Sequence, residues 1–312
     1  MKKKTKIIIP STILTGFVAA TSVATGVMMH NTFFKEKNKK YLMFRSDTPK
    51  EVKDYVLSHQ FEELEITSND GLKLKGQLLR HENSNKLIIC VHGYHSNNFR
   101  EYSDFMAFYY NQGFNIFIPN NRAHGNSEGE IIGFGWLDRL DILCWINYLI
   151  QLLGDKIEIA LQGISMGSAT VLMLSGEELP ENVKCIIADC GFSSVYNEMK
   201  HVAHTINPFI EYIVLPICNI ISKPIIGYNF KEASTLKQVK KSKTPTLFIH
   251  GDQDDFVPTY MVYDLYEACS SDKDLLIVEG AKHARSYQTN KALYELKVNE
   301  FLNKYMTSQS LL

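Results

Sequence analysis

The pattern of apolar and polar positions predicts alternating strands and helices along most of the chain. Residues 61–68 and 72–81 alternate in polarity on either side of an Asn-Asp-Gly sequence, which is typical of a β-hairpin. Short apolar runs at 86–91, 114–119, 183–188, 246–249 and 275–278 predict buried strands. Helical segments at 98–112, 136–153, 259–268 and 284–305 separate or follow them. This alternation predicts an α/β domain with a mostly parallel sheet and helices on both faces.

Residues 157–174 predict a strand, a tight turn and a buried helix in succession. The first half alternates in polarity and is rich in isoleucine, whereas the second half is small and aliphatic. Between them lies a G-x-S-x-G sequence with Ser165 at its centre. In this context the sequence predicts a nucleophile elbow, in which the serine is strained and the glycines avoid pressing on neighbouring backbone. Without that context, the same five residues would indicate an ordinary turn.

Two segments do not fit the alternation. Residues 193–233 are long and apolar, and Pro208, Pro216 and Pro224 should divide them into short helices. Because this segment is inserted between two strands, we expect a cap over the active site; ordinary extra packing is the alternative. Residues 48–58 predict a short amphipathic helix within a spacer that covers 35–60.

The amino-terminal segment contains 23 residues without a charge, from 7 to 29, after a start rich in lysine. As a helix it would extend about 34 Å, enough for the core of a bilayer. We therefore predict a membrane anchor in residues 1–34, with the chain starting in the cytoplasm and the body outside it. A signal peptide cleaved after Ala24, which would give a secreted protein, and a buried helix are alternatives, and a body facing the cytoplasm stays open.

Composition indicates one large domain, here residues 61–312, with an appendage. The chain has 312 residues, of which 45% are hydrophobic, and a formal net charge of −1. Residues 1–40 carry eight lysines and one acid, so the remainder has 25 basic and 33 acidic residues. A body with a net charge of −8 argues against nucleic acid and strongly anionic substrates as partners.

The cysteines give no sign of a metal site or a disulfide framework. No Cys-x-x-Cys sequence or zinc-type Cys/His spacing occurs. We expect free thiols that pack as small apolar side chains. The six cysteines are Cys90, Cys144, Cys185, Cys190, Cys218 and Cys269.

The end of the strand at 86–91 supplies a group that acyl transfer needs. Gly93 ends the strand at 86–91 and allows a sharp turn, after which the amide of Tyr94 can point into a site. Together with the amide of Met166 it would give two donors for the oxyanion of a tetrahedral intermediate.

An acid and a base follow the last two strands. Asp252, Asp254 and Asp255 compete as the carboxylate that orients an imidazole, although a solvated turn or a calcium loop would also account for the cluster. His283 follows the strand at 275–278, where it could take the proton of Ser165 and return it to a leaving group.

From about residue 61 to the carboxyl terminus, the sequence resembles the α/β-hydrolase superfamily, in which the triad follows the order Ser, Asp, His. It is most similar to bacterial serine hydrolases of the esterase-like and serine-aminopeptidase-like kind, some of which have an N-terminal membrane anchor. The resemblance implies the α/β-hydrolase fold, with a mostly parallel central sheet and a helical cap insertion, and no metal or organic cofactor. The matching segments are 92–94, 122–129, 163–167, 251–258 and 280–283.

The resemblance also assigns roles to individual residues. It implies that Ser165 is the nucleophile and His283 the base. The acid of the G-x-x-D-x-x-V-P pattern falls on Asp254. The amides of Tyr94 and Met166 match the oxyanion donors.

Some residues depart from these assignments or compete with them. Ala123 stands where the R-G-H-G-x-S-x-G pattern has glycine, which weakens inferences about the substrate. Asp189, at the end of another strand, is where some relatives keep an alternative acid. His92 and His124 are expected to shape loops. Three further histidines could face the cleft, and nothing in the sequence selects among them: His95, His201 and His204.

The function predicted from these features is that of a serine hydrolase that forms an acyl-enzyme. An ester with an uncharged, moderately apolar acyl group fits the apolar cap best. A peptidase of the same fold is the alternative, and Glu198 or Glu211 could then bind the amine of a peptide. A non-catalytic binding protein on a hydrolase fold is the alternative from another class. The predicted partners are a small acyl ester or peptide and, through residues 1–34, a membrane.

Overall fold

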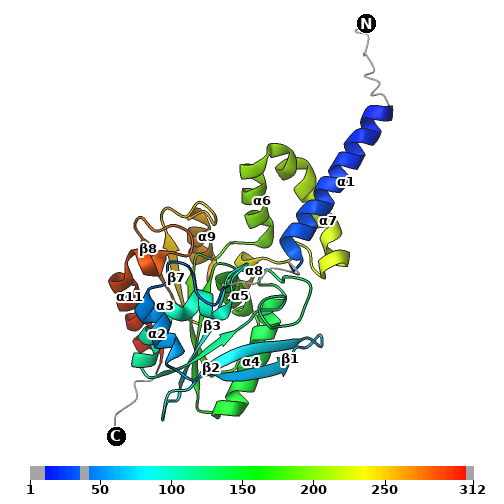
Figure 1. Cartoon of the computed structure of the whole chain (residues 1–312). Helices are drawn as coiled ribbons and strands as arrows, with labels where there is room; N and C mark the ends of the chain where they lie inside the picture. Colours follow the sequence, from blue (N-terminus) through cyan, green and yellow to red (C-terminus); the bar gives the residue numbers. More distant parts are fainter. Residues whose placement is uncertain (1–10, 36–41, 307–312) are drawn as a thin grey trace.

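An eight-stranded sheet runs through the body of the protein (Figure 1). The computed structural model describes residues 11–35 and 42–306. The strand order is β1-β2-β4-β3-β5-β6-β7-β8, in which β2 pairs antiparallel with β1 and β4 and all other neighbours are parallel. This confirms the predicted α/β fold. The strands are β1 Glu62–Thr67, β2 Lys73–Leu79, β3 Lys86–Val91, β4 Phe114–Pro119, β5 Glu158–Ile164, β6 Val183–Asp189, β7 Thr246–Gly251 and β8 Lys273–Val278.

Helices cover both faces of this sheet because its central strands are apolar on both sides. In β3, Ile88 and Cys90 belong to one buried cluster, whereas Leu87, Ile89 and Val91 belong to the other. The first cluster is completed by α2 (Lys50–Leu57), α3 (Asn98–Asn111), α10 (Ser286–Thr289) and α11 (Lys291–Tyr305). The second is completed by α4 (Asp138–Leu153), α5 (Met166–Leu174), α8 (Thr235–Val239) and α9 (Tyr260–Ala268).

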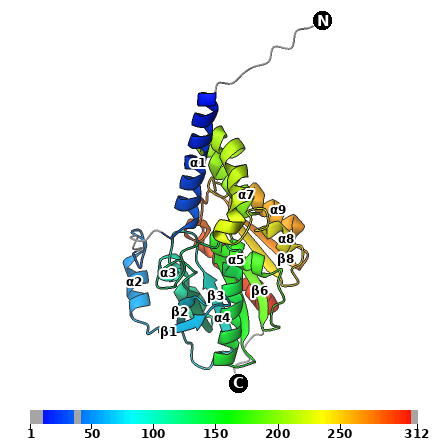
Figure 2. The same cartoon turned by 90° about the vertical axis from the view of Figure 1, so that its right-hand side faces the viewer.

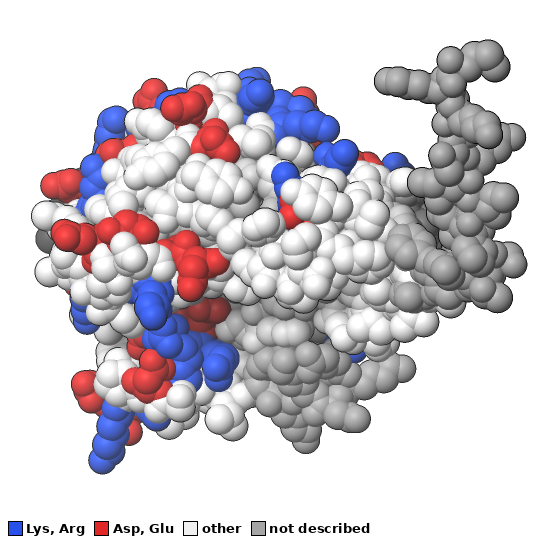
Figure 3. Space-filling model, turned by 90° about the horizontal axis from the view of Figure 1, so that it is seen from above, with Lys and Arg blue, Asp and Glu red and all other residues white. Residues whose placement is uncertain are grey.

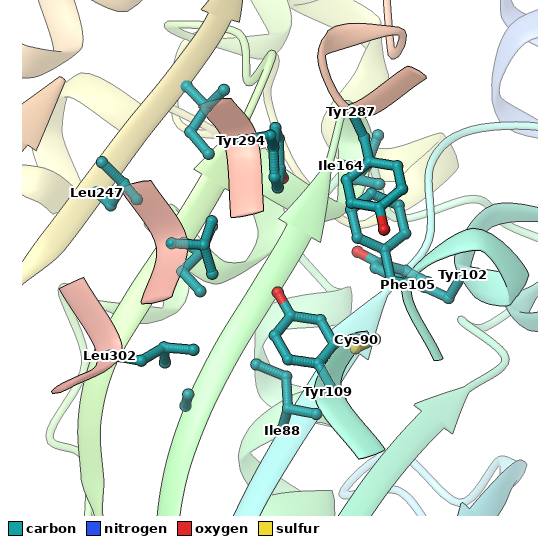
Figure 4. Close-up of a cluster of buried hydrophobic side chains, with 14 of the residues drawn as sticks. Ile88, Cys90, Tyr102, Phe105, Tyr109, Ile164, Leu247, Tyr287, Tyr294 and Leu302 are labelled. Atoms are coloured by element: carbon teal, nitrogen blue, oxygen red, sulfur yellow. The ribbon is translucent and has the colours of Figure 1, made fainter. Parts of the chain in front are cut away.

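Aromatic side chains fill the first of these clusters (Figure 4). Phe105 of α3 contacts the rings of Tyr287 and Tyr294, with centroids 4.1 and 5.8 Å away. The hydroxyl of Tyr109 donates a hydrogen bond to Gln162 of β5. These contacts join α3, α10 and α11 on one side of the sheet.

The predicted elements agree with the structure except in one helix. The hairpin forms as expected, and the six predicted central strands are present. The segment 284–305 is not one helix, because Asn290 divides it into α10 and α11. Asn290 has φ −144° and accepts a hydrogen bond from the amide of Leu293, so it acts as the N-cap of α11.

The chain reverses its direction of winding at β3. From β3 it proceeds to β4 on one side, and it later returns to β5 on the other side of β3. At such a switch point, the connections after the two adjacent strands leave toward opposite faces and open a crevice. Here those connections begin at His92 and Ser165.

The insertion between β6 and β7 contains α6 (Val195–Ile206), a π-helix η1 (Ile210–Val214) and α7 (Leu215–Ile226). Short helices were expected, but the prolines act differently. Pro208 lies in the break between α6 and η1. Pro216 occupies the first turn of α7, where its missing N–H is tolerated, and Pro224 lies inside α7.

The amino-terminal helix α1 (Ser11–Phe33) packs against this insertion. Thr21, Thr25, Met29 and Phe33 are buried at intervals of four residues, which places them on one face of the helix. That face contacts η1 and α7. Figures 1 and 2 show α1 and α7 side by side.

No helix within the described ranges combines the length and the hydropathy required to span a membrane. The predicted membrane anchor, and with it the expected side of a membrane for the body, is therefore not supported. Threonine, serine and glycine lower the hydropathy of this segment, and one face of residues 21–33 is buried, as in the buried-helix alternative. Residues 1–10 of the predicted anchor lie outside the described residues. The boundaries predicted between anchor, spacer and main domain, after residues 34 and 60, stay predictions.

All six cysteines are free thiols, and five of them are buried. Only Cys144 is partly exposed. This agrees with the expectation of thiols that pack as small apolar side chains.

Candidate active site

Ser165 lies at the turn between β5 and α5 in a strained conformation. Its φ and ψ are 56° and −119°, and its amide donates a hydrogen bond to the carbonyl of Asp189 at 2.9 Å. A Cβ on Gly163 would lie 2.2 Å from the carbonyl oxygen of Gly167, and one on Gly167 would lie 1.9 Å from that of Val91. Backbone contact on both sides thus explains why both flanking positions are glycine.

His283 follows β8 and connects Ser165 to a carboxylate. Its Nε2 lies 2.9 Å from Oγ of Ser165, and its Nδ1 lies 2.8 Å from Oδ2 of Asp254. A carboxylate can only accept, so Nδ1 carries the proton and Nε2 is left to accept from the serine hydroxyl. This tautomer is the one in which the imidazole can act as a base toward Ser165.

Asp254 is held as an anion by its surroundings. Its Oδ1 accepts hydrogen bonds from the amides of Phe256 and Val257 at 3.1 and 2.9 Å. Burial by itself would raise the pKa of Asp254, but hydrogen bonds from His250 and His283 outweigh it and hold the pKa well below its usual range. The Asp254 carboxylate is therefore charged at neutral pH.

The other candidate acids have different partners. Asp252 accepts a hydrogen bond from the amide of Gly280, and Asp255 is exposed. The carboxylate of Asp189 accepts from the hydroxyl of Ser286 at 3.1 Å, and burial raises its pKa to about 6. Among the described residues, Asp254 is the one carboxylate hydrogen-bonded to His283.

The two residues whose amides are predicted as oxyanion donors, Tyr94 and Met166, line the same cavity as Ser165. Met166 is the first residue of α5, where a helix leaves its amides without partners inside the helix. The backbone at Gly93 passes so close that a Cβ there would lie 3.3 Å from Cβ of Ser165. Tyr94, Ser165 and Met166 line one cavity.

This cavity has a volume of about 480 Å³ and a mostly apolar wall. Helix α1, helix α6, η1 and the loop after β7 all contribute to it. Uncharged side chains also dominate the middle of the face seen in Figure 3. Apolar lining side chains include Val27, Met28, Phe192, Met199, Val202 and Ile210.

Of the two glutamates named from the sequence, Glu198 lines the cavity. Its side chain is 2% exposed, and neither carboxylate oxygen has a hydrogen-bond partner among the described residues. Burial, together with the charge of Asp254, raises the pKa of Glu198 to about 8. Glu211 does not line the cavity; its Oε2 lies 2.7 Å from Nδ1 of His204.

His92 and His124 support loops next to the site. Nε2 of His92 accepts from the amide of Asn121 at 3.1 Å, so its Nδ1 donates to the carbonyl of Gly93. Burial lowers the pKa of His92 to about 3 and that of His124 to about 4, which makes both neutral. Ala123, which stands where the R-G-H-G-x-S-x-G pattern has glycine, has φ 60°, a conformation that glycine adopts at lower energy.

The remaining histidines lie around the site with other roles. His95 stacks on the ring of Tyr94, with centroids 3.7 Å apart. Nε2 of His201 lies 2.8 Å from the carbonyl oxygen of Asp255. Neither of these two contacts involves Ser165.

One group of side chains in the described part of the chain has the composition of a metal site. Candidate ligand atoms of Cys190, Asp254 and His283 lie within 4.8 Å of one another. Asp254 and His283 are hydrogen-bonded to each other, and His283 is also hydrogen-bonded to Ser165, so the group overlaps the serine–histidine–aspartate chain.

Two contributions were missed by the sequence analysis. His250 is fully buried, and its Nε2 lies 3.3 Å from Oδ2 of Asp254. Its position in the sequence, four residues before Asp254 and at the end of a strand, could have indicated this contact. The cavity wall formed by α1 was missed because its apolar residues indicated a membrane segment.

The fold is that of an α/β-hydrolase. Residues 100–309 match the model of the prolyl oligopeptidase family. The chain belongs to that family.

Individual relatives are similar over most of the chain. The uncharacterized protein YqkD of Bacillus subtilis is 29% identical over 92% of this chain and 95% of its own length. The Pyrococcus furiosus esterase Pf2001 has the same fold, with a TM-score of 0.68 and 24% identity over 88% of this chain and all of its own. The Pyrococcus horikoshii acylaminoacyl peptidase has a TM-score of 0.63 and 19% identity, over 83% of this chain and 45% of its own.

Proposed function

We propose that this hydrolase uses Ser165, His283 and Asp254 as a catalytic triad to cleave an acyl bond through an acyl-enzyme. The observation that carries the proposal is the pair of hydrogen bonds at 2.9 and 2.8 Å that joins the serine hydroxyl, the imidazole and the buried carboxylate. The strained turn at Ser165 supports it, because this conformation is typical of a nucleophile elbow and Ser165 lines the cavity at the end of β5.

The proposed reaction has two halves. Oγ of Ser165 attacks the acyl carbon while Nε2 of His283 takes its proton, and the amides of Tyr94 and Met166 stabilise the oxyanion. The tetrahedral intermediate then expels the leaving group, which receives the proton from His283, and the acyl-enzyme remains. Water attacks this ester with His283 again as the base, the acid product departs, and the proton returns to Ser165.

The apolar cavity favours a substrate with an apolar acyl group, so we propose a carboxylic ester as the substrate class. A peptide bond is the second candidate, because the chain belongs to the prolyl oligopeptidase family. The ester and peptide candidates are distinguished by comparing rates of hydrolysis. The substrates are nitrophenyl esters of short and long acyl chains on one side and aminoacyl 4-nitroanilides on the other. Faster cleavage of the anilides would make the protein a peptidase.

Labelling with a fluorophosphonate tests the proposed function. The wild type should be labelled and Ser165→Ala should not, since the probe reacts with an activated serine. Ser168→Ala is the matched control, because Ser168 is a buried serine on the same helix and should leave labelling intact. A folded wild-type protein that resists labelling would instead favour a binding function on a hydrolase fold.

A further inference from the structure

Among the described residues that line the cavity beside Ser165, one side chain is acidic, and its position suggests what the substrate carries. We propose that Glu198 binds an amino group on the acyl part of the substrate, so that the protein acts on aminoacyl esters or amides. This inference rests on the proposed function and makes Glu198 a specificity-determining residue of that site.

The first argument is that Glu198 is buried without a partner. Its helix, α6, begins at Val195, and the side chain is 2% exposed with both carboxylate oxygens unsatisfied by any described residue. A buried carboxyl without hydrogen bonds is destabilising, so such a group in a folded protein requires an explanation. A ligand that brings its own donors into the cavity would supply one.

The second argument concerns the kind of ligand. The residues that line the cavity include no lysine, arginine or histidine from the described ranges, so an anionic ligand would meet only Glu198 and the nearby Asp254. A carbonyl or ether ligand could accept one hydrogen bond from a protonated Glu198 and would leave the other oxygen unpaired. An ammonium group has three N–H donors and can satisfy both oxygens.

The third argument concerns the proton. Burial raises the pKa of Glu198 to about 8, which is close to the value of about 8 for an α-amino group. A neutral amine can therefore take the proton of the Glu198 carboxyl inside the cavity. The resulting ion pair forms without moving net charge into an apolar space, which removes the main penalty of burying one charge alone.

The cavity volume also suits an amino acid side chain. About 480 Å³ lined by methionine, valine, isoleucine and phenylalanine accommodates an aliphatic or aromatic group. We therefore expect leucine and phenylalanine derivatives to be good substrates.

The test compares two substrates that differ only in the amino group: leucine methyl ester and methyl 4-methylpentanoate. The wild type should prefer the leucine ester in kcat/KM. In Glu198→Gln this preference should fall about 10- to 100-fold, the value of a hydrogen bond to a charged group. Glu211→Gln is the matched control, because Glu211 is a buried glutamate of the same insertion that does not line the cavity, and it should keep the preference.

Binding measured without catalysis separates this inference from the proposed function. Ser165→Ala should bind leucinamide more tightly than 4-methylpentanamide by calorimetry, and the added Glu198→Gln change should remove that difference. Equal binding of the two amides, or an ester preference that survives Glu198→Gln, would overturn the inference. If fluorophosphonate still labels Ser165 in that case, the proposed hydrolase function stands without the amine. A folded wild type that resists labelling and cleaves neither ester would overturn both.

Discussion

Oδ2 of Asp254 faces two imidazoles: Nδ1 of His283 lies 2.8 Å away and Nε2 of His250 lies 3.3 Å away. The same Nε2 of His250 lies 2.8 Å from the carbonyl oxygen of Val257, which can only accept, so this nitrogen carries a proton. His250 thus connects β7 to the loop that contains Asp254. We infer that it is a positioning residue for the carboxylate.

Replacement of His250 should lower kcat more than it changes KM. His250→Leu removes the donor that faces Asp254, and we expect kcat to fall about 10- to 100-fold, as for one hydrogen bond to a charged group. His250→Gln keeps an N–H near the position of Nε2 and should restore most of the loss. A purely structural role would instead give equal losses in both variants, in parallel with their thermal stability.

Asp254 and Asp189 can be separated as candidate acids by matched amide substitutions. Asp254→Asn should lower kcat about 10³- to 10⁴-fold, because the imidazole loses the partner that fixes its tautomer. Asp189→Asn keeps an acceptor for Ser286 and should change kcat by less than about tenfold, since no hydrogen bond joins its side chain to His283 in the structure. Steady-state kinetics on one ester decides the matter, and a larger loss for Asp189→Asn would assign the role to Asp189.

The strain at Ser165 should appear as a difference in stability between two inactive variants. Ser165→Ala and Ser165→Gly both remove the hydroxyl, but glycine adopts φ 56° without the steric penalty of a Cβ. We expect Ser165→Gly to be more stable than Ser165→Ala by about 1–2 kcal/mol in urea unfolding. Equal stabilities would mean that the turn stores no strain.

The burial of Glu198 should make stability depend on pH. The folded protein keeps this carboxyl protonated up to about pH 8, whereas the unfolded chain releases the proton near pH 4.5. The stabilisation that this carboxyl contributes is therefore fully present below pH 4.5 and is lost as the pH rises toward 8. The free energy of unfolding should fall by about 4 kcal/mol at most between pH 5 and 8 for this reason. Glu198→Gln does not titrate, so its stability relative to the wild type should increase between these two pH values in urea unfolding. A constant difference would contradict the raised pKa.

Much of the site could be predicted because its residues lie directly after strands. The order of parallel strands brings their carboxyl ends to one edge of a sheet, so Ser165, His283 and an aspartate were expected to meet there. The residue pattern alone could not select among Asp252, Asp254 and Asp255. That selection depends on which carboxylate the loop turns toward His283, and the backbone amides that bind Asp254 come from the loop itself.

Contacts between distant segments could not be predicted in the same way. The apolar run that includes residues 21–33 is uncharged on all sides, so its pattern fits a bilayer as well as a protein surface. Its actual neighbours, η1 and α7, are about 190 residues away in the chain. Likewise, both Glu198 and Glu211 lie in the insertion, but only tertiary packing decides that Glu211 meets His204 while Glu198 enters the cavity.

The packing of α1 affects how the enzyme should be prepared for assays. Val27, Met28 and Thr32 line the cavity, and the carbonyl of Thr32 accepts a hydrogen bond from the hydroxyl of Tyr94 at 2.9 Å. A recombinant version that begins at residue 35, as is routine for proteins thought to have a leader, would lose one side of the cavity beside Ser165. Turnover numbers from such a truncated preparation would then describe a wider cavity than that of the full chain.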